Sequence, residues 1–125
     1  MQFKYTKQEK LKKRKLIKTL FDNGKAATVF PLRAIYLPLN HDGNFPVQAS
    51  VSVSKRNFKR AVDRNRIKRL MREAYRLNKH LLYHNLEEKY IIMFIYLAKE
   101  EVKMEELHQK MEKLMQKILQ RIKEN

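Results

Sequence analysis

The apolar run at residues 90–98 constrains the fold of this chain more than any other segment. It reads Tyr-Ile-Ile-Met-Phe-Ile-Tyr-Leu-Ala and carries no charged side chain on either face of an extended backbone. Such continuous runs are typical of strands that are covered on both sides. We therefore predict that residues 90–98 form a central β-strand that is buried on both faces.

Two earlier segments also have the patterns of strands. Residues 32–37 are apolar apart from Arg33, and Pro38 ends the run as expected at the end of a strand. Residues 47–54 alternate valine or alanine with glutamine or serine, which is the period of a half-buried strand. The turn-forming residues 40–44 lie between them, so the two segments are predicted to pair as a hairpin with a long tip.

The N-terminal part of the chain is predicted to form one basic helix. Thr6 and Glu9 have the spacing of a capping box, in which each residue satisfies a backbone donor. We expect the helix to continue to about Asn23 and to end where Gly24 adopts the left-handed conformation. Phe21 lies on the apolar side of this helix, so the sequence alone favours core packing for its ring.

Two more helices are predicted in the second half of the chain. One runs over residues 63–84 with Asp63 as its N-cap. The other runs over residues 103–123 and carries an apolar stripe, which is too short for a good coiled coil and is expected to pack on the sheet. Residues 1–125 are thus predicted to form a single α+β domain with about three helices around a small sheet, in the order α-β-β-α-β-α.

The most basic stretch covers residues 55–76, where ten of 22 residues are Lys or Arg and only Asp63 and Glu73 oppose them. Wound as a helix, it gathers its apolar residues on one side, namely Ile67, Leu70, Met71, Ala74 and Leu77. The opposite side carries Arg64, Asn65, Lys68, Arg69, Arg72 and Arg76. A solvated surface helix is the alternative interpretation, but such helices usually interleave Glu with Lys. We favour contact with a phosphate backbone.

Composition supports an anionic partner. The 125 residues carry a formal net charge of +16 and the sequence pI is about 10.2, which is typical of nucleic-acid-binding domains. A membrane surface is the rival partner, but the chain contains neither a long apolar run nor a lipid anchor signal. There is no cysteine, and residues 1–5 lack the apolar core of a signal peptide, so we expect a cytoplasmic protein.

No catalytic set of side chains is legible in the sequence. The adjacent glutamates at positions 87–88, 100–101 and 105–106 are expected to face solvent. His80 and His84 have the spacing of two zinc ligands, but the residues between them include no Glu, and no third ligand is evident. We predict no catalytic and no metal-binding side chains in this chain.

The basic stretch also resembles a known family. Residues 61–69, Ala-Val-Asp-Arg-Asn-Arg-Ile-Lys-Arg, preceded by Val-Ser-Val-Ser-Lys-Arg at 51–56, are similar to the signature of the bacterial ribonuclease P protein family. The resemblance extends over nearly the whole chain, because the order of elements agrees. It implies an α+β fold with a left-handed βαβ crossover around the basic helix. It also implies a subunit that assists a catalytic RNA in removing the 5′ leader from precursor tRNA.

The resemblance assigns roles to particular residues. The RNA-facing surface would comprise Lys55, Arg56, Lys59, Arg60, Arg64, Asn65, Arg66, Lys68, Arg69 and Arg72. A cleft for the leader would be lined by Ile17, Phe21 and Tyr36, with the rings stacking on unpaired bases. Ile17 stands where many members have Phe, and Phe58 where many have Gly. The partners would be the catalytic RNA and precursor tRNA, with magnesium bound through the RNA and no protein partner required.

Two other classes of function fit parts of the sequence. A ribosomal or other structural RNA-binding protein would account for the size and charge, although it does not require the ordered motif. A helix-based DNA-binding module is the second, but the hairpin and the last helix do not suggest a helix-turn-helix pair.

Overall fold

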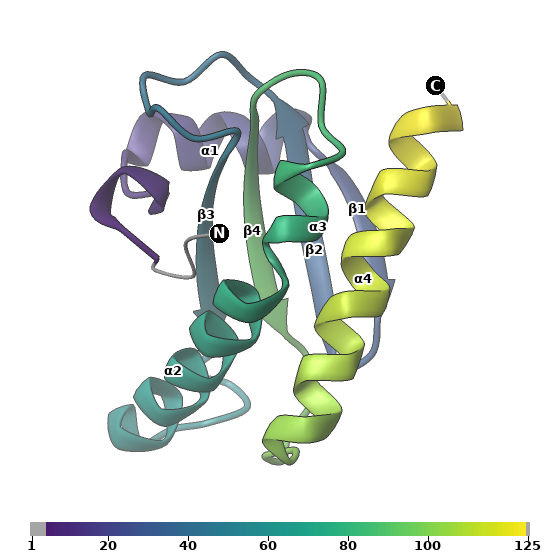
Figure 1. The fold of residues 1–125 in the computed structure, drawn as a ribbon. Helices are drawn as coiled ribbons and strands as arrows, with labels where there is room; N and C mark the ends of the chain where they lie inside the picture. The colour runs from purple at the N-terminus through teal and green to yellow at the C-terminus, as the bar shows by residue number, and fades with distance from the viewer. Residues whose placement is uncertain (1–4, 125) are drawn as a thin grey trace.

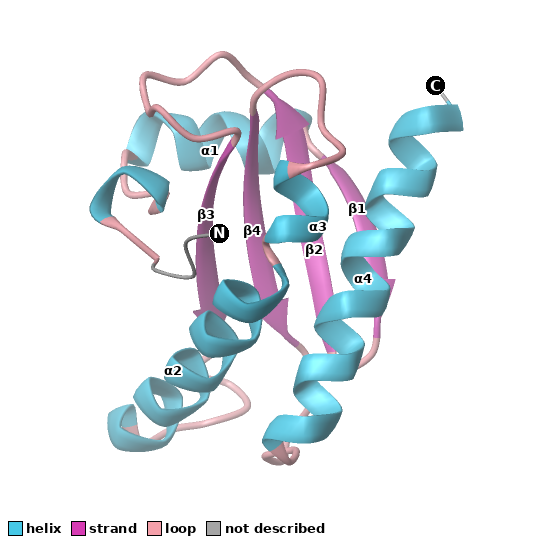
Figure 2. Cartoon of the chain, viewed as in Figure 1, coloured by secondary structure: helices cyan, strands magenta, loops and turns pink. Residues whose placement is uncertain are grey.

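The computed structural model describes residues 5–124, and Figures 1 and 2 show its helices, strands and connecting loops. The elements in chain order are a 3₁₀ turn Lys7–Glu9, α1 Arg14–Asn23, β1 Lys25–Val29, β2 Leu32–Pro38, β3 Val47–Val53, α2 Ala61–Asn78, α3 His80–Tyr83, β4 Tyr90–Tyr96 and α4 Met104–Glu124. The predicted α+β class is therefore confirmed, with one more strand and one more short helix than expected.

The four strands form one mixed sheet in the order β1-β2-β4-β3. Strand β4 lies inside it, pairs antiparallel with β2 and parallel with β3, and is almost entirely buried, as the apolar run predicts. The predicted hairpin between β2 and β3 is wrong, because β4 lies between them. Strand β2 instead forms its hairpin with β1, which begins with the weak strand formers Lys25, Ala26 and Ala27 and was not predicted.

The helices lie on both faces of this sheet. In Figure 1, α2 and α4 lie in front of the sheet and α1 lies behind it. Strands β3 and β4 run in the same direction with β4 to the right, and the connection through α2 passes in front, so the crossover is left-handed. Crossovers of this kind are right-handed in about 98% of cases. The hand expected from the resemblance is therefore the one observed.

Two apolar clusters fill the space between these layers. The larger one packs α2 and α4 against the side chains of β2 and β4 that point forward, with Tyr75, Phe94 and Tyr96 at its centre. The smaller one lies under α1, where Leu20 packs on Ile91 of β4. The predicted packing of the last helix on the sheet is confirmed.

The N-terminal helix differs from its prediction. The capping box of Thr6 and Glu9 is present, but it starts only a 3₁₀ turn, and Lys10 is already extended. The chain then runs beside β3, where the Leu11 amide donates to the Ala49 carbonyl at 2.9 Å. Helix α1 therefore begins only at Arg14. The backbone donors that a longer helix would use internally serve this edge of the sheet instead.

Gly24 also acts differently from its prediction. Its φ is −75°, so the backbone is extended and not left-handed. A Cβ at this position would lie 2.5 Å from the Leu20 carbonyl oxygen and 2.7 Å from Cγ2 of Ile35. Glycine is required because α1 and β2 approach closely here, and not because of its freedom in φ.

Helix α2 begins two residues earlier than predicted and ends six residues earlier. Arg60 precedes it as the N-cap, so Asp63 lies within the first turn and is not the cap. The chain turns at Lys79 and continues as the short α3. The apolar stripe predicted for α2 faces the core, with Ile67, Met71 and Ala74 each at most 1% exposed.

Candidate RNA interface

The loop between β3 and α2 carries the first predicted RNA-binding residues, and it is held rigidly. The Asn57 side chain donates to the Leu97 carbonyl at 3.3 Å, and the Asn57 amide donates to Oγ of Ser54 at 3.3 Å. Phe58 packs on the core with its ring centroid 6.0 Å from that of Tyr96. No non-glycine residue among those described has a positive φ. The loop thus accommodates Phe58 by packing its partly buried ring against the core.

Arg64 braces this loop from the first turns of α2. Its Nη1 donates to the carbonyls of Phe58 at 2.7 Å and Lys59 at 2.9 Å. These bonds hold the loop against the helix, with Lys55, Arg56, Lys59 and Arg60 exposed around it. Arg64 is therefore a positioning residue for the neighbouring cations, in addition to any contact of its own.

Arg66 is paired with two carboxylates, and the helical pattern reveals only one of them, Asp63, which lies three residues earlier on α2. Its Nε donates to Glu101 at 2.6 Å, and its Nη2 donates to Asp63 at 3.0 Å. Hydrogen bonding and charge from Glu101 raise the pKa of Arg66, so its guanidinium stays charged. The Tyr96 hydroxyl positions Glu101 by donating to the Glu100 carbonyl at 2.5 Å and accepting from the Val102 amide at 3.1 Å. An RNA phosphate would therefore compete with carboxylates for Nε and Nη2 of Arg66.

The rest of the predicted surface lies on the outward side of α2. Asn65 and Arg69 are exposed, whereas Lys68 and Arg72 are half-buried and turn toward the N-terminal segment. There they line a hollow of about 330 Å³ together with Lys10 and Lys12. We call this hollow the basic groove. The structure brings all ten predicted residues to α2 and its loop with at least partly exposed side chains, and two of them, Arg60 and Arg66, are already paired with carboxylates.

Sequence reasoning missed the two lysines of the basic groove. Residues 7–18 carry seven Lys or Arg against one Glu, so the density of charge was visible. The expected continuous helix would have distributed these residues around its surface. The observed extended segment instead lies beside β3 and places Lys10 and Lys12 opposite α2.

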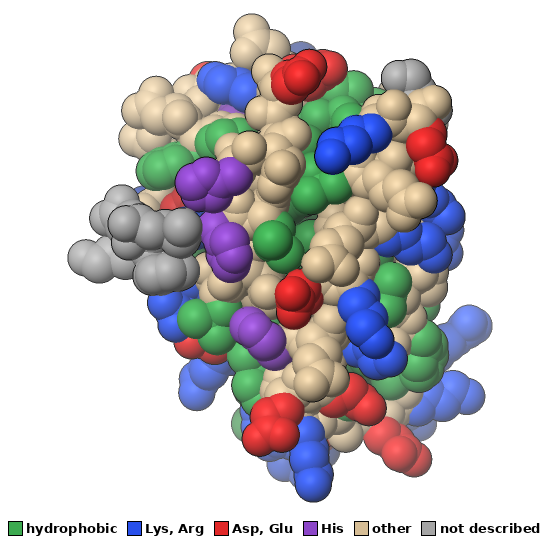
Figure 3. Space-filling model, turned by 45° about the vertical axis from the view of Figure 1, so that its right-hand side comes forward, with side chains coloured by type: hydrophobic (Ala, Val, Ile, Leu, Met, Phe, Trp, Pro, Cys, Tyr) green, Lys and Arg blue, Asp and Glu red, His purple; other side chains and the backbone are tan. Residues whose placement is uncertain are grey.

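The surface over α4 has a different charge pattern. Figure 3 shows acidic and basic side chains interleaved along this side of the molecule, with apolar side chains between them. Glu105 and Glu106 lie in the first turn of α4, and Arg121 and Lys123 lie in its last turn. That distribution stabilises the helix through its dipole. The segregated positive charge belongs to α2, its loop and the N-terminal segment.

The predicted leader cleft is only partly assembled. Ile17 packs half-buried on the cluster beneath α1, and Phe21 of the same helix is 50% exposed. Core packing of Phe21, which the sequence alone favoured, is wrong. An exposed ring remains able to stack on a base.

Tyr36 does not reach this surface. It is 3% exposed and belongs to the cluster on the opposite side of the sheet, with its ring centroid 6.5 Å from that of Tyr90. Its neighbour Ile35 points toward α1 and packs there. Successive side chains of a strand point to opposite faces, so a shift of one residue in register places a side chain on the other face of the sheet. The placement of Tyr36 in the cleft is wrong.

Within residues 5–124 no three His, Asp or Glu side chains lie together as a bound cation would require. Over the same residues, no helix has the length and hydropathy needed to cross a membrane.

A mixed four-stranded sheet with a left-handed crossover and cations gathered on α2, its loop and the N-terminal segment defines a small nucleic-acid-binding α+β protein. The family described as Ribonuclease P matches residues 5–119. The ribonuclease P protein component of Porphyromonas gingivalis is 48% identical over 102 residues, which cover 78% of this chain and 74% of that protein. That of Caldanaerobacter subterraneus is 36% identical over 109 residues, covering 86% and 87%.

Solved structures agree in fold. The RNase P protein from Thermotoga maritima superposes with a TM-score of 0.70 at 22% identity, covering 87% of this chain and 96% of that one. The Staphylococcus aureus RNase P protein gives 0.69 at 19% identity, covering 88% and 94%. The chain belongs to the ribonuclease P protein family, and so to the protein components of an RNA-containing endoribonuclease.

Proposed function

We propose that this chain binds the catalytic RNA of ribonuclease P through α2 and the preceding loop, and binds the 5′ leader of precursor tRNA beside α1. The observation that carries the proposal is the segregation of charge on α2. Its apolar stripe is buried, and its outward face presents Arg69 and Asn65 beside the braced loop cations. Arginine forks match pairs of phosphate oxygens, which suits an RNA backbone.

The RNA would perform the hydrolysis, with magnesium bound through the RNA. The described chain offers no group of carboxylates suited to hold that ion. Its contribution would be electrostatic: cations on α2 neutralise phosphates that otherwise repel each other when substrate and catalytic RNA meet. The exposed ring of Phe21 would stack on an unpaired leader base.

Reconstitution tests this function. Purified protein freed of RNA is expected to leave precursor tRNA intact, whereas addition to its cognate catalytic RNA should accelerate 5′ cleavage at low magnesium. Turnover by the protein that survives exhaustive nuclease treatment would contradict the assignment of hydrolysis to the RNA. Copurification with ribosomal RNA in place of one structured RNA of another kind would favour a ribosomal role.

A further inference from the structure

The N-terminal segment is fixed in place before any RNA binds. Inside, the Glu9 carboxylate is fully buried and accepts from Lys79 and from the Tyr83 hydroxyl at the corner between α2 and α3. At the edge of the sheet, the Tyr5 hydroxyl and the Leu11 amide both donate to the Ala49 carbonyl. The lysines of this segment are therefore presented by a rigid support.

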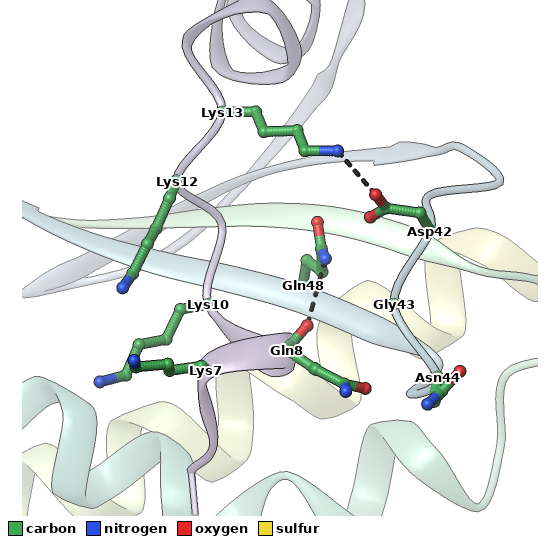
Figure 4. Close-up of a pocket in the computed structure, with 9 residues that line it drawn as sticks. All are labelled: Lys7, Gln8, Lys10, Lys12, Lys13, Asp42, Gly43, Asn44 and Gln48. Atoms are coloured by element: carbon green, nitrogen blue, oxygen red, sulfur yellow. Dashed lines mark hydrogen bonds and ion pairs between the residues drawn. The ribbon is translucent and has the colours of Figure 1, made fainter.

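The loop between β2 and β3 supports the segment from its other side. Figure 4 shows the Gln48 side chain donating to the Gln8 carbonyl, and Lys13 reaching across to Asp42. A Cβ at Gly43 would lie 2.9 Å from the Gln8 carbonyl oxygen, so only glycine lets the loop approach this closely. In the same view Lys7, Lys10 and Lys12 point away from the loop.

Two of these lysines, Lys10 and Lys12, line the basic groove. They line it from the N-terminal segment, and Lys68 and Arg72 line it from α2. No carboxylate lines this hollow, because Glu9 is turned into the core. Lys10 is further positioned by the Tyr5 ring, with its Nζ 5.5 Å from the ring centroid.

From this geometry we infer that the basic groove is a second RNA-binding site, which takes a phosphodiester segment of the catalytic RNA. The inference rests on the proposed function. Four cations around one hollow suit the phosphate backbone, which provides most of the affinity in such complexes. The catalytic RNA is the partner because Lys68 and Arg72 lie on the helix proposed to bind it, so the two surfaces are continuous.

The test compares two double variants that lose the same charge. Lys10→Gln/Lys12→Gln removes two cations from the groove, and Lys113→Gln/Lys123→Gln removes two exposed cations from α4. Binding to the catalytic RNA, without substrate, is measured over a range of salt. We expect the groove variant to lower the salt slope by about 1.4–1.8 and to bind roughly 15- to 30-fold more weakly at about 0.15 M salt. The α4 variant should change little.

A further variant separates positioning from charge. Glu9→Gln leaves all four groove cations and raises the net charge by one, so a general charge effect would tighten RNA binding. Because Glu9→Gln should release the N-terminal segment, we expect both the RNA affinity and the salt slope to decrease instead. Circular dichroism at the assay temperature establishes whether Glu9→Gln is folded. The comparison of the Lys10/Lys12 variant with the α4 variant does not depend on this third variant.

The possible outcomes are distinguishable. An equal loss of RNA affinity in the groove and α4 variants would overturn the groove as a binding site, since net charge alone would then explain binding. The groove variant could instead bind the catalytic RNA normally and lose affinity only for precursor tRNA with a long leader, measured on the holoenzyme. That result would assign the groove to the leader and overturn the catalytic RNA as its partner. If Arg69→Ala weakens binding and the groove variant does not, the groove inference fails while the proposed function stands. If the unaltered protein binds no catalytic RNA, the proposed function fails and the inference fails with it.

Discussion

Glu9 and Lys79 form a buried ion pair across 70 residues of sequence, with Nζ and Oε2 2.5 Å apart and side-chain exposures of 0% and 5%. The Thr6 amide donates to the other carboxylate oxygen at 2.8 Å. The Tyr83 hydroxyl also donates to the carboxylate. The pair therefore ties the N-terminal segment to the corner between α2 and α3.

Loss of this carboxylate should destabilise the protein strongly. In Glu9→Gln the Lys79 ammonium remains buried without its countercharge, which typically costs about 3–5 kcal/mol. Asp22→Asn is the matched control, because Asp22 pairs with Lys18 on the surface and exposed pairs contribute little to stability. Denaturant unfolding of both variants measures the difference. Equal losses would show that the buried pair contributes no more than an exposed one.

The same carboxylate should make stability depend on pH. Burial alone would raise the pKa of Glu9, but hydrogen bonds from Lys79, the Thr6 amide and Tyr83 outweigh it and lower the pKa below its ordinary value of 4.5. As the pH falls below 4.5, the unfolded chain takes up the proton first, so stability decreases until the folded pKa is passed.

Free energies of unfolding measured from about pH 7 to about pH 3 check this dependence. The decrease should be smaller in Glu9→Gln, which has no carboxyl to protonate at this position. An identical pH profile in the variant would assign the acid sensitivity to other carboxylates.

Arg64 and Arg69 should respond differently to truncation, although both belong to the same basic helix. Arg69 is exposed, so Arg69→Ala should lower the salt slope of RNA binding by about 0.7–0.9 and leave stability unchanged. Arg64 holds the carbonyls of Phe58 and Lys59, so Arg64→Ala should also loosen the loop. Hydrogen exchange of loop amides, measured beside RNA affinity, checks this distinction. Equal exchange in the two variants would contradict the bracing role.

Glu101 should act as an internal competitor of RNA. It occupies Nε of Arg66 in the free protein, so Glu101→Gln should free this nitrogen, while Asp63 still holds Nη2, and should tighten RNA binding by roughly 1.5- to 5-fold, the equivalent of an exposed ion pair. Glu105→Gln makes the same change of charge on α4 and serves as the control. Affinity is measured by titration at fixed salt. If both variants tighten binding equally, the effect is one of net charge and not of the Arg66 pair.

The elements with strong periodic patterns could be predicted from the sequence. The elements and pairings that depend on tertiary contacts could not. The run that became β4 and the apolar stripes of α2 and α4 were predicted correctly, because apolar spacing reports burial directly, whereas the end of α2 was misplaced by six residues. Strand β1 was missed because its alanines carry little signal, and the β2–β3 hairpin was wrong because adjacency in sequence does not determine strand order. Pairing between distant residues, as for Arg66 with Glu101, leaves no local pattern.

Substitutions at Phe21 and Tyr36 should distinguish a ring that stacks on RNA from a ring that packs in the core. Phe21 is half exposed, so Phe21→Leu should leave stability nearly unchanged but weaken binding of precursor tRNA to the reconstituted holoenzyme. A lost stack costs about 1–3 kcal/mol, or roughly five- to 150-fold in affinity. Tyr36 is buried on the other side of the sheet, so Tyr36→Ala should cost about 3–5 kcal/mol of stability, as large aromatic truncations in a core do.

Precursor and mature tRNA, each titrated against the holoenzyme with thermal unfolding followed in parallel, give the decisive comparison. Phe21→Leu should weaken precursor binding and spare mature tRNA, because only the precursor carries a leader base to stack on the ring. Tyr36→Ala should weaken both ligands only to the extent that the protein unfolds, since its side chain lies among Tyr90 and the α4 side of the core. Loss of precursor binding in a fully folded Tyr36→Ala protein would show that the ring leaves the core when the leader binds, and would restore it to the cleft.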